Sequence, residues 1–411
     1  MGEAASSSSP QPAGSSSESA AGRASGGSRS SPNPLRVVIA AGGTAGHIMP
    51  TLALAEELRD RGHEVSFVGV GGRAGSGIPE RNGYREDHVP LRGFERRLSI
   101  RNLWRAVLAV LAVPRMMGVL RRRKAQVVVG GGGYMAGPAA IAGRLTRRRV
   151  LLMEADSRLG LANRLAAPFA KRVALAFPVA GRRGRKYVVT GRPVSRAVRE
   201  ATREGGRLHL GIDPSGTCVL VAGGSQGAQS VNDAAIDAFC PTPPFQVVHV
   251  AGERNEADVR ARVEAAGGGP RYHVHGFLED FPQAIAAADL VISRSGGSVF
   301  ELAAVGRPAI LIPYPHATAD HQTGNARWLS DAGAAIMLTD DECTGDRLRE
   351  LVGALLAEPG RLEVMGDAAR AAARPDAAER IADMVESVAR PPRGGGRDRR
   401  DRRGRGRLRR R

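Results

Sequence analysis

The sequence predicts an α/β protein with two doubly wound domains that face each other across a cleft. From residue 35 onward, short β-branched runs alternate with helical stretches rich in Ala, Leu and Arg, as in parallel sheets covered by helices. The alternation occurs in two series, because new strands follow the GRPVS segment at 191–195. The 411 residues also exceed what one hydrophobic core usually supports. We therefore expect two domains with a hinge near 190–195.

The first domain is expected to span 34–190 and the second 191–374, followed by a C-terminal helix at 375–390. In the first domain we expect strands at 35–40, 64–70, 126–130, 150–153, 172–177 and 186–190. In the second we expect strands at 217–222, 245–251, 271–276, 289–293 and 308–313.

The two ends of the chain differ in composition from the rest. The first 33 residues contain twelve Ser, and residues 393–411 hold eleven Arg against two Asp. Neither end shows apolar periodicity, so we expect a disordered leader at 1–33 and a disordered tail at 391–411.

The net charge and the spacing of the cysteines exclude some classes of protein and site. The tail supplies +9 of the net charge of +19, and the remainder of the chain still favours an anionic partner. The three cysteines are widely separated, which argues against a disulfide framework and against a structural zinc site. No uncharged apolar run reaches 18 residues, so we expect no membrane-spanning helix.

Both halves open with a strand, a glycine-rich turn and a helix. The segments are VVIAAGGTAGH at 37–47 and VLVAGGSQGA at 219–228. Such turns let backbone N–H groups approach an anion without obstruction, although a single turn could simply permit a tight crossing. Because ligands bind at the carboxyl ends of strands in doubly wound sheets, the pair predicts a diphosphate site in the cleft.

Four further features indicate chemistry at this cleft. His47 begins a helix, where the helix dipole favours a neutral imidazole that can accept a proton. Thr44 adds a hydroxyl that suits a ligand or a helix cap equally well. Glu301 follows a third strand and small polar turn, and its carboxylate suits a ribose diol, although a carboxylate is also favoured in any first helical turn. Polar residues that suit a sugar crowd the next loop: Asp320, His321, Gln322 and Asn325.

Six segments, taken in order over residues 35–390, resemble the MurG family. They are GGTAGHIMPTLALAEEL, GGGYMAGP, GGSQGAQSVN, RSGGSVFELAAVGRPAILIPYP, DHQTGNA and PDAAERIADMVESVAR. The resemblance implies a GT-B glycosyltransferase that acts with inversion at the cytoplasmic face of the cell membrane. It implies transfer of N-acetylglucosamine from UDP-N-acetylglucosamine to the 4-hydroxyl of N-acetylmuramyl-pentapeptide on undecaprenyl diphosphate, the step from lipid I to lipid II of peptidoglycan synthesis. It also implies no cofactor and no metal.

The resemblance carries site residues with it. His47 and Glu154 would be catalytic, with His47 as the general base. Donor contacts would come from Thr44, Ala45, Gly46, Asp156, Ser195, Ser225, Leu278, Ser298, Glu301 and Gln322. Leu278 would lie against uracil, Glu301 would hold the ribose and Gln322 the transferred sugar. The acceptor would face Gly132, Gly133, Tyr134 and Gly137.

The chain departs from the family pattern at two places. The usual HEQN segment is MEAD at 153–156, which puts Asp156 where an amide is expected. The usual Asn-Pro-Val-Arg is RPVS at 192–195, which leaves Ser195 where a donor-binding arginine is expected. Arg192 and Arg196 are the possible substitutes.

Residues 98–124 combine an apolar surface with flanking arginines, the pattern of a helix that lies on an anionic membrane. The apolar set is Leu103, Trp104, Val107, Leu108, Leu111, Met116, Met117 and Leu120. The alternative is an ordinary pair of helices packed on the sheet. The Arg-rich tail could add to membrane attraction, but it lacks interleaved aromatic residues, so we do not expect a nucleic-acid partner.

Three other functions fit part of the pattern. A related GT-B transferase could use a UDP-sugar with a different lipid or a small acceptor. A UDP-sugar epimerase could share the two-domain architecture. A non-catalytic nucleotide-sugar binding protein would be compatible with the MEAD and RPVS changes.

Overall fold

The structure is a computed structural model that describes residues 33–42, 45–72, 77–91, 100–224, 226–317 and 320–390. The side chains of residues 45 and 100–107 are not described. The expected N-terminal leader, apart from residue 33, and the expected Arg-rich tail lie outside the described residues.

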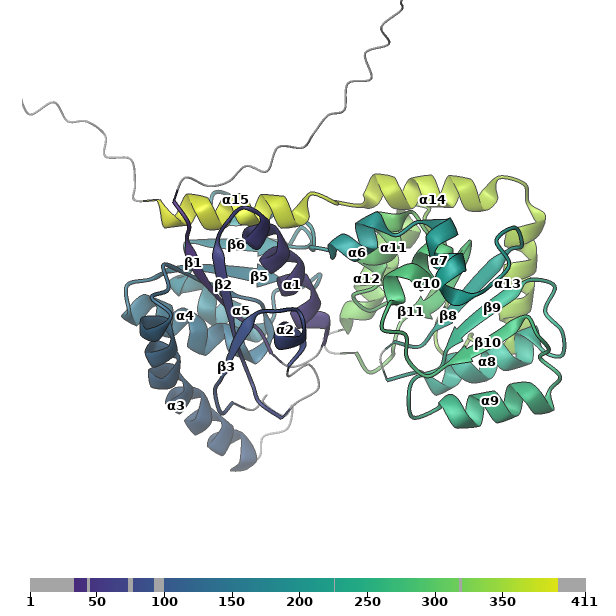
Figure 1. Cartoon of the computed structure of the whole chain (residues 1–411), viewed down its shortest axis with the longest axis horizontal. Helices are drawn as coiled ribbons and strands as arrows, with labels where there is room; N and C mark the ends of the chain where they lie inside the picture. Colours follow the sequence, from purple (N-terminus) through teal and green to yellow (C-terminus); the bar gives the residue numbers. More distant parts are fainter. Residues whose placement is uncertain are drawn as a thin grey trace, which may run out of the picture.

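The first domain is a seven-stranded parallel sheet in the order β3-β2-β1-β4-β5-β6-β7 (Figure 1). Its strands are β1 Arg36–Ala40, β2 Glu64–Gly69, β3 Arg85–His88, β4 Val127–Gly130, β5 Arg149–Glu154, β6 Arg172–Leu175 and β7 Tyr187–Val189. Its helices are α1 Ala45–Asp60, α2 Ile78–Arg81, α3 Ile100–Arg122, α4 Ala136–Leu145 and α5 Leu161–Ala166, with short 3₁₀ turns at Gly133–Met135 and Ala167–Phe169.

Alternate residues of β1 show how this sheet is covered on both faces. Val37 and Ile39 belong to a core with α1 and the C-terminal helix, whereas Val38 and Ala40 pack with α3 and α4. A strand buried on both faces reads as a continuous apolar run, which is why β1 could be predicted from the sequence.

The second domain is a six-stranded parallel sheet in the order β10-β9-β8-β11-β12-β13. Its strands are β8 Cys218–Ala222, β9 Gln246–Val250, β10 Tyr272–His275, β11 Leu290–Arg294, β12 Ala309–Ile312 and β13 Ala335–Met337. Its helices are α6 Arg196–Glu200, α7 Arg203–Leu210, α8 Gln229–Phe239, α9 Glu256–Ala265, α10 Phe281–Ala287, α11 Val299–Val305, α12 His321–Asp331, α13 Gly345–Ala357 and α14 Arg361–Ala372. The predicted fold class, two doubly wound parallel sheets, is confirmed.

The last helix, α15 (Ala377–Ala389), returns to the first domain and lies along it (Figure 1). Ile381, Ala382 and Val385 are buried in the core formed with α1 and β1. At its edge, the Arg61 guanidinium lies 2.6 Å from the Asp383 carboxylate, and Nε2 of His63 lies 3.2 Å from Glu386. The chain therefore crosses between the domains twice.

The helix α3 corrects part of the predicted membrane surface. Met116 and Leu120 are fully buried in the core against the first sheet, because they lie on the helix face that covers β1 and β4. They cannot contact lipid, whereas Val110 and Leu111 on the same helix are exposed. Within the described ranges, no helix has the length and apolarity needed to span a bilayer.

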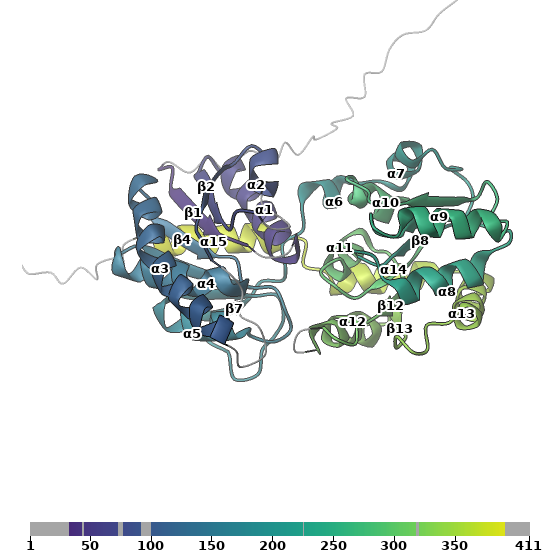
Figure 2. The same cartoon turned by 90° about the horizontal axis from the view of Figure 1, so that it is seen from below.

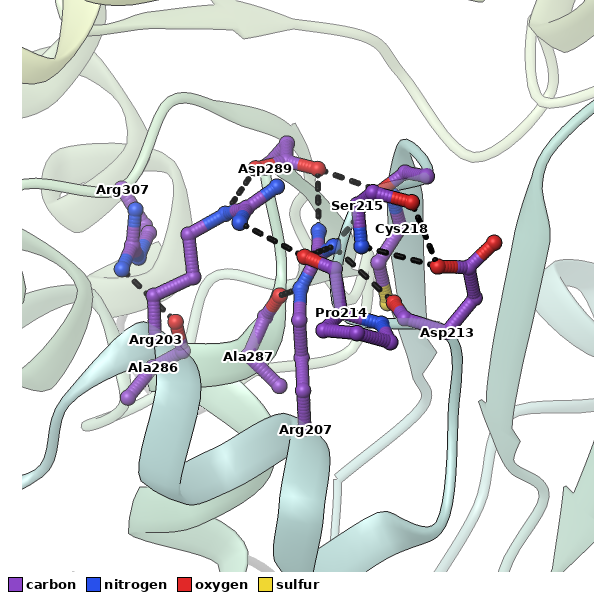
Figure 3. Close-up of polar contacts among 11 residues, drawn as sticks. Arg203, Arg207, Asp213, Pro214, Ser215, Cys218, Ala286, Ala287, Asp289 and Arg307 are labelled. Carbon is purple, nitrogen blue, oxygen red and sulfur yellow. Dashed lines mark hydrogen bonds and ion pairs between the residues drawn. The ribbon is translucent and has the colours of Figure 1, made fainter. Parts of the chain in front are cut away.

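A buried arginine ties together the end of the second sheet that lies opposite the strand carboxyl ends (Figure 3). Arg207 is 1% exposed, and its guanidinium donates to the carbonyls of Ala287, Asp213, Pro214 and Gly216. It also lies 2.7 Å from Asp289, whose carboxylate accepts from the backbone N–H of Cys218 at the start of β8. This network joins α7, the loop before β8 and the residue before β11.

We predict that Arg207→Ala lowers the free energy of unfolding of the second domain by about 3 kcal/mol or more, because it leaves several carbonyls without their donor and removes a buried cation paired with Asp289. Urea unfolding in a Trp104→Phe background measures this, since Trp328 then reports on the second domain alone. The matched control is Arg347→Ala, which removes an exposed pair with Glu350 and should cost less than about 1 kcal/mol. Equal losses in the two variants would contradict the prediction.

Candidate functional site

The site begins at the point where the first sheet changes winding direction. β1 lies between β2 and β4, so the chain leaves β1 toward one face and β4 toward the other, and a crevice opens at their carboxyl ends. The first turn of α1, which follows β1, contributes His47, and the turn after β4 contributes Gly132 and Gly133. The structure thus brings the predicted base and two predicted acceptor residues together.

Close approach explains the glycines in the second of these turns. A Cβ atom on Gly132 would lie 3.3 Å from Nδ1 of His47, and one on Gly133 would lie 3.3 Å from the Gly42 carbonyl oxygen. Both residues also have positive φ, 93° and 61°, which disfavours other residue types. The imidazole therefore packs directly on the backbone of the predicted acceptor turn.

Burial favours the neutral form of His47. Burial lowers the pKa of the imidazole below its usual 6.5, the negative charge of Asp156 opposes this, and the positive charges of Arg192 and His321 add to it. Nδ1 is buried and has no hydrogen-bond partner among the described residues. A neutral ring with a free nitrogen can accept a proton, as general-base chemistry requires.

Glu154, the other predicted catalytic residue, ends β5 and holds the loop that follows it. Its carboxylate accepts from the backbone N–H of Gly160 at 2.8 Å and from the Asn163 amide at 3.0 Å. The backbone N–H of Asp156 lies 3.3 Å from the other carboxylate oxygen. Burial raises the pKa of Glu154, while these hydrogen bonds oppose the rise. The contacts explain how Glu154 positions Asp156, and its catalytic role stays a prediction.

The second crevice lies between β8 and β11, where the second sheet changes winding direction. Beside it, Ser295 donates its hydroxyl to the carbonyl of Gln322, and the Asn325 amide donates to the carbonyl of Ser295. The side-chain oxygen of Gln322 accepts from the backbone N–H of Tyr314 at 2.9 Å, which fixes the direction of the amide. These bonds tie the start of α12 to the end of β11.

A narrow cavity lies between the two domains. It is lined by Met49, Pro50, Arg192, Pro193, Val194, Ser195, Gly297 and Glu301. Arg192 donates to the Gly46 carbonyl at 2.6 Å, and its guanidinium lies 5.5 Å from the centre of the Phe300 ring. Burial raises the pKa of Glu301, and the nearby positive charge of Arg192 opposes the rise.

The other predicted residues have varied placements. Thr44 and Ser225 lie outside the described residues, and Ala45 begins α1 with its side chain not described. Ser195 caps α6, its hydroxyl accepting from the backbone N–H of Val198. Leu278 packs against the core of the second domain, and Ser298 precedes α11.

The acceptor contacts expected of Tyr134 and Gly137 stay predictions. Tyr134 packs against the core formed with α3, and a Cβ atom on Gly137 would meet open space. Arg192 was named in advance only as a possible substitute for the donor-binding arginine, on the signal of an arginine in place of the family's asparagine. Its position in the cavity required the tertiary structure.

Comparison with known protein families identifies both domains. Residues 37–175 match the glycosyltransferase family 28 N-terminal domain, and residues 218–381 match the family's C-terminal domain. A protein of Halothermothrix orenii named UDP-N-acetylglucosamine--N-acetylmuramyl-(pentapeptide) pyrophosphoryl-undecaprenol N-acetylglucosamine transferase is 35% identical over 368 residues, covering 86% of this chain and 99% of that protein. A protein of the same name from Halorhodospira halophila is 39% identical over 375 residues, covering 86% and 98%.

Solved structures agree with this match. MurG of Acinetobacter baumannii superimposes with a TM-score of 0.67 at 27% identity, covering 86% of this chain and 100% of that chain. A UDP-N-acetylglucosamine 2-epimerase superimposes with a TM-score of 0.60 at 17% identity, covering 85% of this chain and 95% of that one. At that identity the epimerase shows a shared fold alone.

We predict that His47 titrates below pH 6.5, and that Asp156→Asn lowers its pKa further, because the negative charge of Asp156 favours the imidazolium. NMR titration of histidine-labelled protein measures both values, with His47→Gln identifying the signal. The matched control is Asp346→Asn, which removes a carboxylate that is 96% exposed on α13 and should leave His47 unchanged. A His47 titration midpoint at or above pH 6.5, or a higher His47 pKa in Asp156→Asn than in the parent, would contradict the prediction.

Proposed function

The chain belongs to the MurG family within glycosyltransferase family 28, and we propose that it transfers N-acetylglucosamine from UDP-N-acetylglucosamine to N-acetylmuramyl-pentapeptide on undecaprenyl diphosphate. The observation that carries the proposal is the position of His47. The imidazole lies against Gly132 and Gly133, and Arg192, which lines the interdomain cavity, donates to the carbonyl of Gly46, the residue before His47. This geometry supports a proton acceptor that lies beside the acceptor turn and near the interdomain cavity.

The proposed reaction is a single inverting displacement. The 4-hydroxyl oxygen of the acceptor attacks the anomeric carbon from the face opposite UDP and forms the new C–O bond. The bond from that carbon to the diphosphate oxygen breaks, UDP leaves with the electron pair, and His47 takes the hydroxyl proton. A positioned base and a group that stabilises the leaving diphosphate are sufficient for this chemistry.

Donor recognition is proposed at the second domain side of the cavity. Glu301 lines the cavity and would accept hydrogen bonds from the ribose hydroxyls. Gln322 would contact the transferred sugar, which requires exchange of its present hydrogen bond from Tyr314. Leu278 follows β10 and would lie against the base.

The identity of the acceptor has less support from the sequence than the identity of the donor. Met153, Asp156 and Ser195 depart from the family pattern near the cleft, and these changes favour a second candidate, a related transferase with the same donor and a different lipid or small acceptor. The fold shared with the epimerase does not favour epimerisation, because an epimerase would have no use for the acceptor turn beside His47.

We propose that the enzyme is peripheral, contacting the cytoplasmic face of the cell membrane through α3 and the helices beside it. In sequence order, α3 packs on α4, and α4 packs on α5 (Figure 2). Val110 and Leu111 of α3 are 69% and 45% exposed, while Leu161 and Leu165 of α5 are 70% and 66% exposed. Such exposure of large apolar side chains on neighbouring helices is typical of an interaction surface.

Charge around α5 supports a lipid surface as the partner. Leu161 and Leu165 are four residues apart on α5, so they share one face, and the exposed Phe169 follows in the 3₁₀ turn. Exposed cations lie nearby in the sequence at Arg158, Arg164 and Lys171. An apolar stripe flanked by cations fits an anionic bilayer, and contact there would bring the lipid-linked acceptor to the first domain.

The transfer itself is tested by incubating the full chain with UDP-N-acetylglucosamine and a short-chain lipid-linked muramyl-pentapeptide. We expect a product heavier by one N-acetylglucosamine residue, with release of UDP that depends on the acceptor. We expect His47→Ala to lower kcat by about 10²-fold or more, because it removes the general base. His209→Ala, on the exposed surface of the second domain, should retain parental turnover. Return of an altered UDP-sugar without acceptor would indicate epimerisation, and a His47→Ala rate within about threefold of the parent would exclude His47 as the base.

Membrane contact is tested by co-sedimentation with vesicles that contain anionic lipid. We expect the double change Leu161→Ser and Leu165→Ser to weaken binding by about tenfold or more, since it removes two side chains that would be buried in the bilayer. Leu208→Ser is the matched control, because Leu208 is 85% exposed on the second domain. Equal binding to anionic and neutral vesicles, or equal loss in both variants, would remove α5 from the proposed surface.

A further inference from the structure

Arg192 is the positively charged residue that lines the interdomain cavity. It is 8% exposed, and it lies on the segment that connects the two domains. Its guanidinium reaches three separate elements: the Gly46 carbonyl at the start of α1, the Phe300 ring on α11, and Gly297 before α11. A Cβ atom on Gly297 would lie 2.3 Å from Arg192 Nη2, so the guanidinium packs directly on that backbone.

The charge of Arg192 is only partly balanced by its neighbours. Asp156, Glu301 and Glu154 favour its charged form while burial lowers its pKa. In the described part of the chain, however, none of these carboxylates forms an ion pair with it within 4 Å, and its hydrogen bond goes to a neutral carbonyl. A buried guanidinium held by a carbonyl can exchange that bond for one to an anionic oxygen, which is a stronger partner.

The residue at which the family carries a donor-binding arginine is committed elsewhere in this chain. Ser195 lines the same cavity, but its hydroxyl caps α6 by accepting from Val198. The other arginine of the hinge, Arg196, forms an ion pair with Asp60. It does not line the cavity. Arg192 is therefore the hinge arginine whose position suits a ligand in the cavity.

We infer that Arg192 binds the diphosphate of the donor and stabilises the charge that develops on it as UDP leaves. This inference rests on the proposed function. The planar guanidinium would donate two N–H groups to phosphate oxygens in place of the Gly46 carbonyl. Because Gly46 belongs to the turn expected to meet the same diphosphate, the exchange needs only a local movement. The positive charge has thus moved from residue 195 of the family pattern to residue 192.

This role of Arg192 explains why residue 156 is an aspartate. It stands where the family has an amide, and its negative charge acts on both Arg192 and His47. A carboxylate at this position balances an additional buried cation, so the two departures from the family pattern compensate each other electrostatically.

The test is calorimetric titration of the full chain with UDP and, separately, with uridine. We expect Arg192→Gln to weaken UDP binding by about tenfold or more and to leave uridine binding unchanged, because uridine has no phosphate. Arg192→Lys retains the charge and should lose less affinity for UDP than Arg192→Gln. In the transfer assay, Arg192→Gln should raise the donor KM and lower kcat, since the contact strengthens as the leaving group gains charge.

Arg196→Gln is the matched control, because it removes a positive charge from the same hinge outside the cavity. It should bind UDP as the parent does. UDP affinity of Arg192→Gln within threefold of the parent overturns the inference, as does an equal loss for UDP and uridine, which would indicate a collapsed cleft. Arg192→Lys binding as weakly as Arg192→Gln would also overturn a role for the charge. A parent chain that binds no UDP would instead overturn the proposed function itself.

Discussion

The double crossing of the chain between its domains is the constraint on which the site depends. The loop between β6 and β7 packs on the second domain, where the Phe177 ring lies 5.0 Å from that of Phe300 and 5.5 Å from that of Trp328. The first crossing follows β7. The second crossing passes beside it, since a Cβ atom on Gly191 would lie 2.6 Å from the Cβ atom of Arg374. The helix α15 then packs on the first domain. With both crossings fixed, the carboxyl ends of the two sheets meet at one cavity.

The same crossings explain why so much charge gathers in a buried place. Arg192 is carried by the first crossing, Asp156 follows β5, and Glu301 lies on α11. Each of these groups would be costly to bury alone, and each changes the proton affinity of its neighbours. The result is a neutral imidazole next to a cation, which is a useful pairing when one group accepts a proton and the other faces an anion.

The sequence predicted those elements whose signal is local. The strands β1, β4, β5, β8 and β11 are buried on both faces and read as apolar runs. The strand β3 was missed because Arg85, Glu86, Asp87 and His88 form a polar edge with no apolar alternation. The three-residue strand β13 at the edge of the second sheet was too short to detect. A last helix was expected, but nothing in its own sequence indicated that it would return to the first domain.

The site residues also separate into those that a local sequence pattern predicts and those that require the tertiary structure. Glycine turns and a histidine at a helix start are local patterns, so His47, Gly132 and Gly133 could be named in advance. The choice between Arg192 and Arg196 as the substitute at Ser195 could not, because the two arginines lie within five residues and differ in the direction of their side chains. Ser195 faces the cavity but caps a helix, Arg196 turns to Asp60, and Arg192 reaches the Gly46 carbonyl. The positive charge of a motif can therefore be supplied from a different position in the sequence. Only the packing of the hinge shows which side chain supplies it.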